Sequence, residues 1–189
     1  MRSITLSMKI LVTYFSQTGN TEKIAQVFHE IASQNHESYL KRIKKVKVKE
    51  LDDFDLIFIG SACHDSDLAK PVLRFLKKIP ESPKYAIAGF YTHSTYLPEG
   101  DERIIKISDR WSGRCSETFE KLKKEKNVNF KGYFRCQGIP SPPIEQFIHK
   151  TIIKDDEEWA VFLDEVKKHP NENDLENTKK FVKDILNEF

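Results

Sequence analysis

An apolar segment followed by a short polar loop and a helix-forming segment constrains this chain most. Residues 9–15, Lys-Ile-Leu-Val-Thr-Tyr-Phe, are rich in β-branched and aromatic side chains, as expected of a buried parallel strand. Beyond the loop, apolar residues recur at the i, i+3, i+4 and i+7 positions of a helix: Ile24, Val27, Phe28 and Ile31. This order predicts a strand, a tight loop and a helix that packs one face on the sheet.

The loop itself, residues 16–21, has the composition of a phosphate-binding site. It offers the hydroxyls of Ser16, Thr18 and Thr21, together with the unpaired backbone N–H groups and the positive dipole end of the following helix. It contains no lysine or arginine, unlike the Walker-type loop of proteins that bind nucleoside triphosphates. A ligand with a single phosphate is therefore favoured. The alternative is an ordinary helix-start turn, because Ser, Thr and Asn are also preferred as helix caps.

The rest of the chain alternates between strand-like and helix-like segments. The expected strands are residues 38–43, 54–60, 85–91 and 128–136, and the expected helices are residues 71–79, 103–124, 159–166 and 173–189. A capping box of Asn173 and Glu176 is expected to start the last helix, whereas 139–143 is expected to be a proline-rich loop. This alternation predicts an α/β fold with a doubly wound, five-stranded parallel sheet between two helical layers. We expect one domain over residues 1–189, with residues 139–189 as a helical C-terminal extension that closes it.

Composition excludes several classes of protein. Hydrophobic residues make up 39% of the chain and charged residues 32%, which is typical of a globular protein rather than a disordered one. No apolar run is long enough to span a membrane and the first residues lack a signal-peptide core, so we expect a cytoplasmic location. Cys63, Cys115 and Cys136 form no Cys-x-x-Cys pair, which favours reduced thiols over disulfides or a zinc site.

Charge is distributed unevenly along the chain. The net charge is +2, but residues 151–189 contain 6 lysines and 11 acidic residues, and a basic run covers residues 41–49. Such a run can attract nucleic acid, but it lacks aromatic residues for base stacking. Its lysines alternate with Val46 and Val48, which favours the solvated face of an edge strand. We therefore expect no nucleic-acid partner.

The motif Ser16-x-Thr18-Gly19-x-Thr21 after the first strand resembles the phosphate loop of the flavodoxin-like family at every defining position. Residues 51–61 resemble the third strand of that family with its loop, and residues 71–76 resemble the next helix. The resemblance extends over about residues 9–138. It implies a flavodoxin-like fold and flavin mononucleotide (FMN) as the cofactor.

The expected site lies outside the carboxyl ends of the strands, where the strand order of a doubly wound sheet reverses. Loops 16–21, 61–68 and 92–100 meet there, and the resemblance implies that the second and third hold the isoalloxazine ring. Tyr96 is the candidate for stacking on the ring. The predicted cofactor-binding residues are Ser16, Gln17, Thr18, Gly19, Asn20, Thr21, Ser61, Ala62, Cys63, His64, Thr92, His93, Tyr96 and Gly100.

Other chemistry at these loops is less well supported by the sequence. Cys63, His64, Asp65 and Asp67 lack any standard metal-ligand spacing, so no metal is expected. No Ser-His-Asp or Cys-His arrangement is visible, and no catalytic residue is assigned. The bound flavin would carry the chemistry.

Three functions remain open at this point. The leading hypothesis is an electron carrier between redox partner proteins or small electron donors and acceptors. The alternative is an FMN-dependent NAD(P)H oxidoreductase that reduces a quinone or another small acceptor. A third hypothesis, a binding module that has lost the flavin, is disfavoured by the intact phosphate loop. The sequence makes no prediction of the oligomeric state.

Overall fold

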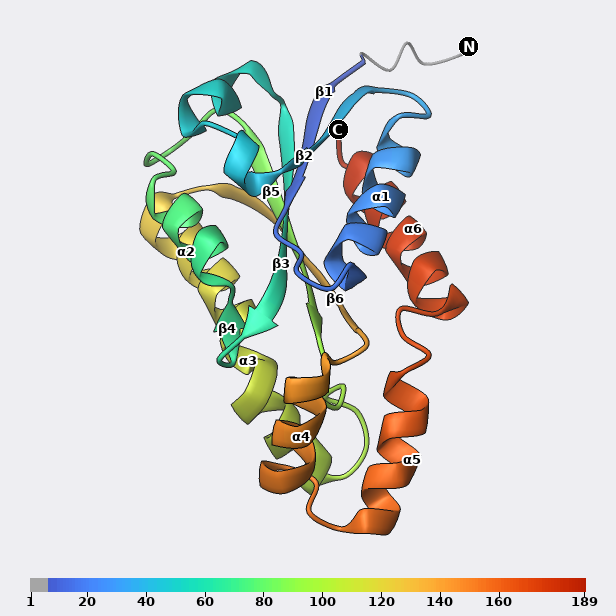
Figure 1. Ribbon diagram of the computed structural model, residues 1–189. Coiled ribbons are helices and arrows are strands. Elements are labelled where there is room, and N and C mark those ends of the chain that lie inside the picture. The colour runs from blue at the N-terminus through green and yellow to red at the C-terminus, as the bar shows by residue number, and fades with distance from the viewer. Residues whose placement is uncertain (1–6) are drawn as a thin grey trace.

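The computed structural model describes residues 7–189 and has three layers, with a sheet between two groups of helices (Figure 1). The strands are β1 (Lys9–Tyr14), β2 (Glu37–Arg42), β3 (Leu56–His64), β4 (Asp67–Leu68), β5 (Ala86–His93) and β6 (Asn129–Gln137). The α-helices are α1 (Asn20–Ala32), α2 (Lys70–Lys77), α3 (Glu102–Lys126), α4 (Pro142–Thr151), α5 (Asp156–Val166) and α6 (Glu172–Leu186). Two short 3-10 helices are η1 (Ile43–Lys45) and η2 (Val48–Asp53).

The sheet has the predicted doubly wound topology. Its strand order is β2-β1-β3-β5-β6, all parallel, and the two-residue strand β4 pairs antiparallel with the end of β3. Leu11 of β1 is in register with Tyr39 on one side and Ile57 on the other. Chain order reverses around β1, and such a reversal opens a crevice at the carboxyl ends of the strands. The predicted fold class is therefore confirmed, with β4 as an addition.

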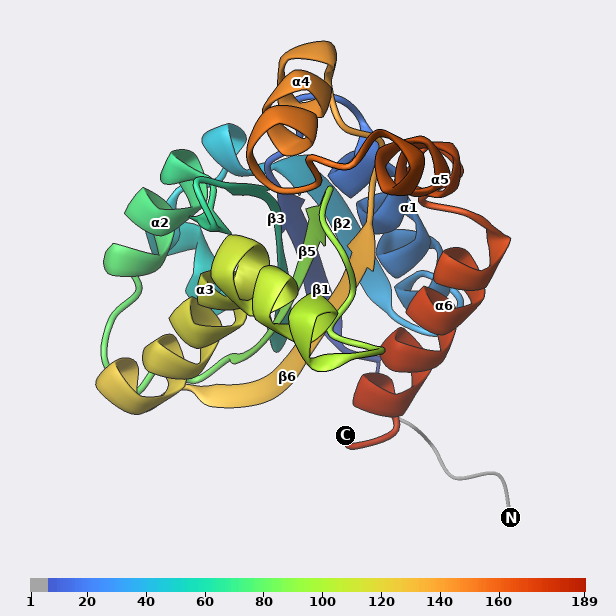
Figure 2. The ribbon, with the colours of Figure 1, turned by 90° about the horizontal axis from the view of Figure 1, so that it is seen from below.

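Each face of the sheet packs on its own apolar core. Seen from below, α2 and α3 cover one face and α1 and α6 the other (Figure 2). On the α1 side, the ring of Phe28 stacks on Phe90 at 4.3 Å between centroids and meets Phe58 edge-on at 4.9 Å. All three side chains are fully buried. Strands β1, β3 and β5 are buried on both faces, which explains their nearly continuous apolar sequence.

The basic segment differs from the expectation of an edge strand. Strand β2 ends at Arg42, and residues 43–53 form η1 and η2 instead. The reason is that Ile43, Val46 and Leu51 are all buried in the core on the α2 side. A strand would expose alternate residues, whereas these tight turns bring each apolar side chain inward and leave the lysines in solvent.

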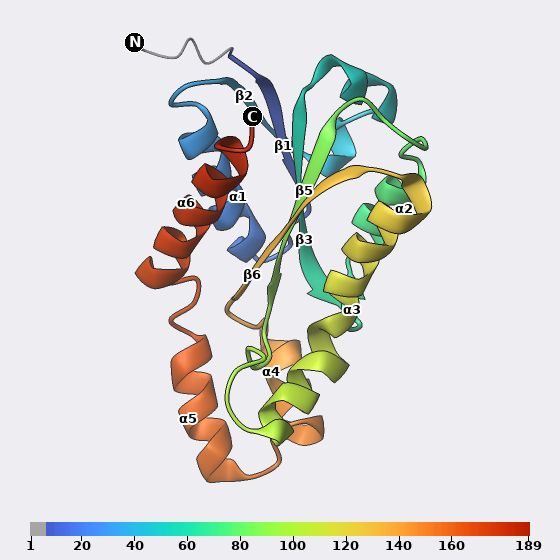
Figure 3. The same ribbon diagram turned by 180° about the vertical axis from the view of Figure 1, so that it is seen from behind.

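The C-terminal region contains a helix that the sequence analysis missed. Residues 142–151 form α4, which begins with Pro142 and Pro143 in its first turn, where a missing N–H costs nothing. Helices α4 and α5 lie beyond the carboxyl ends of the strands, at the bottom of Figure 1 and also in Figure 3. No helix within residues 7–189 is long and apolar enough to cross a membrane.

The observed capping box of the last helix lies two residues before the predicted one. Helix α6 is capped by Asn171, whose side chain accepts from the Asp174 N–H at 3.1 Å. The Asp174 carboxylate in turn accepts from the Asn171 N–H at 2.8 Å. Asp174 is buried, and its Oδ2 also lies 2.5 Å from His169 Nδ1. This second contact holds Asp174 in the first turn of α6, so the helix begins earlier than the sequence predicts. Helix α6 then packs along α1.

Candidate functional site

A cavity of about 640 Å³ lies at the carboxyl ends of β1, β3 and β5, within the size range of small-molecule sites. It is lined by Gln17, Thr18 and Asn20, and by the ranges 62–66 and 92–95 from the two other predicted loops. Residues of α4 and the Gly138–Ile139 turn complete its wall, with Trp111 from α3. The structure thus brings the three predicted loops together around one cavity.

The first loop is a tight turn between β1 and α1. The Ser16 hydroxyl accepts from the Gly19 N–H at 3.1 Å and closes the turn. Gly19 has φ +99°, in the left-handed region that favours glycine, and it is the N-cap of α1. Thr21 is buried, and its hydroxyl is 2.8 Å from the Thr92 hydroxyl of β5, which fixes the start of α1 against the sheet.

The beginning of α1 presents free hydrogen-bond donors. The first intrahelical bond runs from the Lys23 N–H to the Gly19 carbonyl at 2.9 Å, so the N–H groups of residues 20–22 have no acceptor within the helix. The N-cap residue is Gly19, which has no side chain to accept from these N–H groups. These donors carry the partial positive charge of the helix end, which amounts to roughly half an elementary charge. The geometry is that of an anion site that uses neutral donors.

Asn20 links this loop to the end of β6. Its Nδ2 donates to the Ile139 carbonyl at 2.8 Å and to the Thr18 hydroxyl at 3.2 Å. Gly138 lies against it so closely that a Cβ at this glycine would be 2.7 Å from Asn20 Cγ. The absence of a side chain at Gly138 therefore lets the β6 turn approach the anion site.

The second predicted loop is partly strand. Ala62, Cys63 and His64 extend β3 and line the cavity, and a turn with positive φ at Asp65 and Ser66 leads into β4. His64 meets the ring of Phe15 edge-on at 5.7 Å, and burial lowers the pKa of its imidazole, which favours the neutral form.

Ser61 supports this hairpin rather than lining the cavity. It is fully buried, its Oγ accepts from the Ala69 N–H at 2.9 Å, and its hydroxyl donates to the Ala62 carbonyl at 2.8 Å. These bonds fix the end of β3 against the start of α2.

The third loop places a neutral histidine beside the cavity. Burial, and then the nearby charge of Arg135, lower the pKa of His93 to about 3. Its Nδ1 accepts from the Thr95 N–H at 3.4 Å, so the proton of the neutral ring resides on Nε2. Within the described residues, both His93 Nε2 and Thr95 Oγ1 are buried without a hydrogen-bond partner. Each unsatisfied group costs about 1–3 kcal/mol, which a polar ligand edge would offset.

Tyr96 is directed away from the position predicted for it. Its ring packs edge-on against Phe162 of α5 at 4.8 Å, and its hydroxyl donates to Glu158 Oε1 at 2.6 Å. Burial and the adjacent Glu158 carboxylate raise the pKa of Tyr96. Tyr96 therefore joins the small apolar core of α4 and α5, which includes Ile148 and Phe162. Gly100, with φ +108°, turns the chain just before α3.

The cavity also has an apolar wall that was not predicted from the sequence. Trp111 of α3 and Phe147 of α4 meet edge-on at 5.3 Å, and both line the cavity. Ile144 and Phe147 are 45% and 43% exposed, unusual for large apolar side chains. Their spacing with Ile148, at i, i+3 and i+4, was a usable helical signal after the proline pair.

These features define an α/β protein that binds a phosphorylated ligand outside the carboxyl ends of its strands. The chain matches the flavodoxin domain over residues 11–183, and it belongs to this family. The predicted flavodoxin-like resemblance is thereby confirmed, and membership of this family indicates FMN as the cofactor.

Individual relatives agree with this assignment. An uncharacterized protein of Methanocaldococcus jannaschii is 28% identical over 185 residues, which cover 95% of this chain and 99% of that protein. A flavodoxin from the domain Archaea superposes with a TM-score of 0.61 at 18% identity, covering 96% of this chain and 98% of the other. Flavodoxin 2 from Bacillus cereus gives 0.63 at 18% identity, covering 96% and 99%. At these identities the two solved structures support the fold alone.

Proposed function

We propose that the protein transfers electrons through bound FMN, as a carrier between redox partners. The observation that carries this proposal is the lysine-free anion site at residues 16–21, which opens into a cavity of about 640 Å³ at the topological switch point. FMN supplies chemistry that the side chains lack, since a bound flavin accepts two electrons and can release them one at a time.

The loop residues fit the phosphate end of this cofactor. In the proposal, the hydroxyls of Ser16 and Thr18 and the N–H groups of residues 20–22 donate to the phosphate oxygens. Gln17 lines the same end of the cavity. Gly19 gives the turn its left-handed conformation, and Thr21 holds the helix start through Thr92. Neutral donors and a helix dipole suit a dianion without a paired lysine.

The other two loops fit the polar edge of the ring. His93 Nε2 carries a proton without a partner, so it is suited to donate to a ring carbonyl oxygen, and Thr95 is suited to a second bond. Ala62, Cys63 and His64 provide the side of the cavity along β3. Ser61 acts as a positioning residue because it holds this hairpin by two hydrogen bonds.

The apolar wall takes the stacking role that the sequence analysis gave to Tyr96. Trp111, Phe147 and Ile144 present flat and branched apolar surface to the same cavity. Aromatic side chains bind flat rings by offset or edge-on packing, and they exclude water from them. We propose that α4 contributes to ring binding in this way.

A stepwise anaerobic reduction of the FMN-loaded protein tests the carrier function. A carrier is expected to show two well-separated one-electron potentials and no turnover with NADH or NADPH. A single two-electron step, together with steady oxidation of either nicotinamide cofactor, would contradict it.

The second candidate, an FMN-dependent oxidoreductase with a small acceptor, is favoured by one observation. Helix α4 lies across the carboxyl ends of the strands, and its residues form one wall of the cavity (Figure 1). In this second proposal, α4 hinders the approach of a large protein partner more than that of a small molecule. Steady-state oxidation of NAD(P)H with a quinone as acceptor distinguishes this candidate from the carrier.

A further inference from the structure

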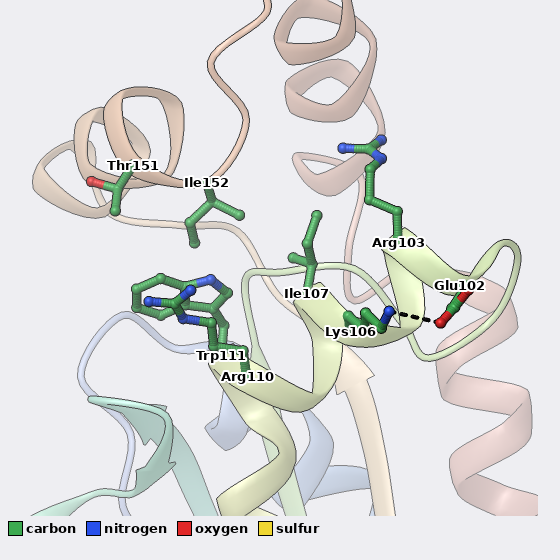
Figure 4. Close-up of a pocket in the computed structure, with 8 residues that line it drawn as sticks. All are labelled: Glu102, Arg103, Lys106, Ile107, Arg110, Trp111, Thr151 and Ile152. Carbon is green, nitrogen blue, oxygen red and sulfur yellow. Dashed lines mark ion pairs between the residues drawn. The ribbon is translucent and has the colours of Figure 1, made fainter.

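A second cleft, of about 500 Å³, lies beside the proposed flavin cavity. Figure 4 shows the residues that line it. It is formed by the N-terminal half of α3 and the C-terminal end of α4. Trp111 and Ile152 line both this cleft and the flavin cavity. The two cavities therefore adjoin each other at these side chains.

The cleft is rich in positive charge. Arg103, Lys106 and Arg110 lie three and four residues apart on α3, so they share one face of the helix. Anionic groups are the natural ligands of such a surface.

Among residues 7–189, two of these cations form no strong ion pair. Lys106 pairs only with Glu102, at 2.7 Å, and with side chains 71% and 82% exposed this i, i+4 pair is weak. Arg110 has no carboxylate within 4.0 Å among residues 7–189; its guanidinium lies over the Trp111 ring, 5.2 Å from its centroid. Arg103, by contrast, is held by Glu158 at 2.7 Å.

The remaining surface of the cleft is apolar and partly flat. Figure 4 shows Ile107 and Ile152 pointing toward each other from α3 and α4, with the Trp111 indole below them. A stacked guanidinium and indole offer both a cation and a planar surface. This combination recognises planar aromatic molecules that carry a negative group.

We propose that this cleft binds a planar aromatic molecule with a sulfonate, carboxylate or phosphate group, and that this molecule is the small redox partner of the flavin site. The assignment as a redox partner rests on the proposed electron-transfer function, whereas the binding itself does not. A quinone of this class would gain two electrons and two protons to become the hydroquinone. The reduced cofactor would supply the two electrons and the two protons and would itself be reoxidised.

Anthraquinone-2-sulfonate is a suitable probe because it is planar, anionic and unreactive toward thiols. Its binding is measured by equilibrium dialysis with the protein saturated in FMN, and again without FMN. The test variant combines Lys106→Gln and Arg110→Gln. The control combines Lys123→Gln and Lys124→Gln, which make the same charge change at exposed positions near the other end of α3.

The wild type and the control are expected to bind the probe equally, with an affinity that falls as salt is raised. The test variant is expected to bind about 10-fold more weakly, and neutral 2-(hydroxymethyl)anthraquinone should bind all three proteins alike. Equal loss in both variants would overturn the proposal, since net charge alone would then explain it. Displacement of the probe by FMN would also overturn it, because the probe would then occupy the flavin cavity.

Measuring probe binding with and without FMN separates this inference from the proposed function. Loss of affinity confined to the test variant, in protein that fails to bind FMN, would support the cleft and refute the flavin function. FMN binding without any cleft-dependent probe binding would refute the cleft alone. Urea unfolding of each variant confirms that the substitutions leave the fold intact.

Discussion

Replacing Gly138 by alanine should damage both the fold and the anion site. The new Cβ would lie 2.7 Å from Asn20 Cγ and 2.8 Å from Asn20 Cβ and Nδ2. The amide group could rotate away, but the Asn20 Cβ cannot move without the backbone. Because Asn20 is the first residue of α1, the start of the helix itself must shift. Overpacking of this kind costs roughly 1–3 kcal/mol.

The expected result is a free energy of unfolding lower by about 1–3 kcal/mol in urea, measured without FMN. The dissociation constant of FMN should also rise, since the displaced N–H groups of residues 20–22 belong to the anion site. Fluorescence quenching of added FMN measures it directly.

A double-mutant cycle isolates the cause. All three close atoms belong to the Asn20 side chain, so Asn20→Gly removes them. The double variant Asn20→Gly with Gly138→Ala should be as stable as Asn20→Gly alone, within about 0.5 kcal/mol. A Gly138→Ala protein with wild-type stability would refute the reasoning, and so would a Gly138→Ala substitution that destabilises the Asn20→Gly protein as much as it destabilises the wild type.

Three further predictions address the core, the histidine and the α4–α5 pair. Phe28→Ala should lower the free energy of unfolding by about 3–5 kcal/mol in urea, because the fully buried ring packs on two others, while Phe189→Ala at a half-exposed end should change it by under about 0.5 kcal/mol. The pKa of His93 falls from 6.5 to about 3 on folding, so the unfolded chain binds the proton first as the pH is lowered. The free energy of unfolding should therefore be highest above pH 6.5 and should decrease as the pH falls toward 3. An equally steep decrease in the His93→Gln protein would exclude this cause. Glu158→Gln should speed hydrogen exchange in α4 and α5, since Glu158 accepts hydrogen bonds from Tyr96 and from Arg103 of α3. Glu157→Gln is the control, and hydrogen exchange that is equally fast in this control would show that the two Glu158 contacts do not stabilise the helix pair.

The fold was predictable because its signals are local and periodic. The buried strands, the glycine turn at Gly19 and the amphipathic helices each follow from spacing and burial that a short window of sequence contains. The 43–53 segment was misread because Val46 and Val48 alternate with lysines, although tertiary packing buries Ile43 and Leu51 in tight turns.

The site was predictable only in part, for a physical reason. The loop at residues 16–21 contains its own donors, so its chemistry could be inferred without neighbours. The wall of Trp111 and Phe147 depends on how α3 and α4 meet across the cavity, which no local pattern contains. Tyr96 was assigned to the ring because its partners, Phe162 and Glu158, lie 62 or more residues away in a helix pair whose position the sequence did not predict.

The most direct test of the central claim compares FMN with riboflavin, which differs only by the phosphate. Titration of the purified protein, followed by flavin fluorescence, should show FMN binding at least about 100-fold more tightly, since two or more charged hydrogen bonds contribute roughly 1.5–3 kcal/mol each. Equal affinities for the two flavins, or no binding of FMN, would contradict the assignment of residues 16–21 as a phosphate site.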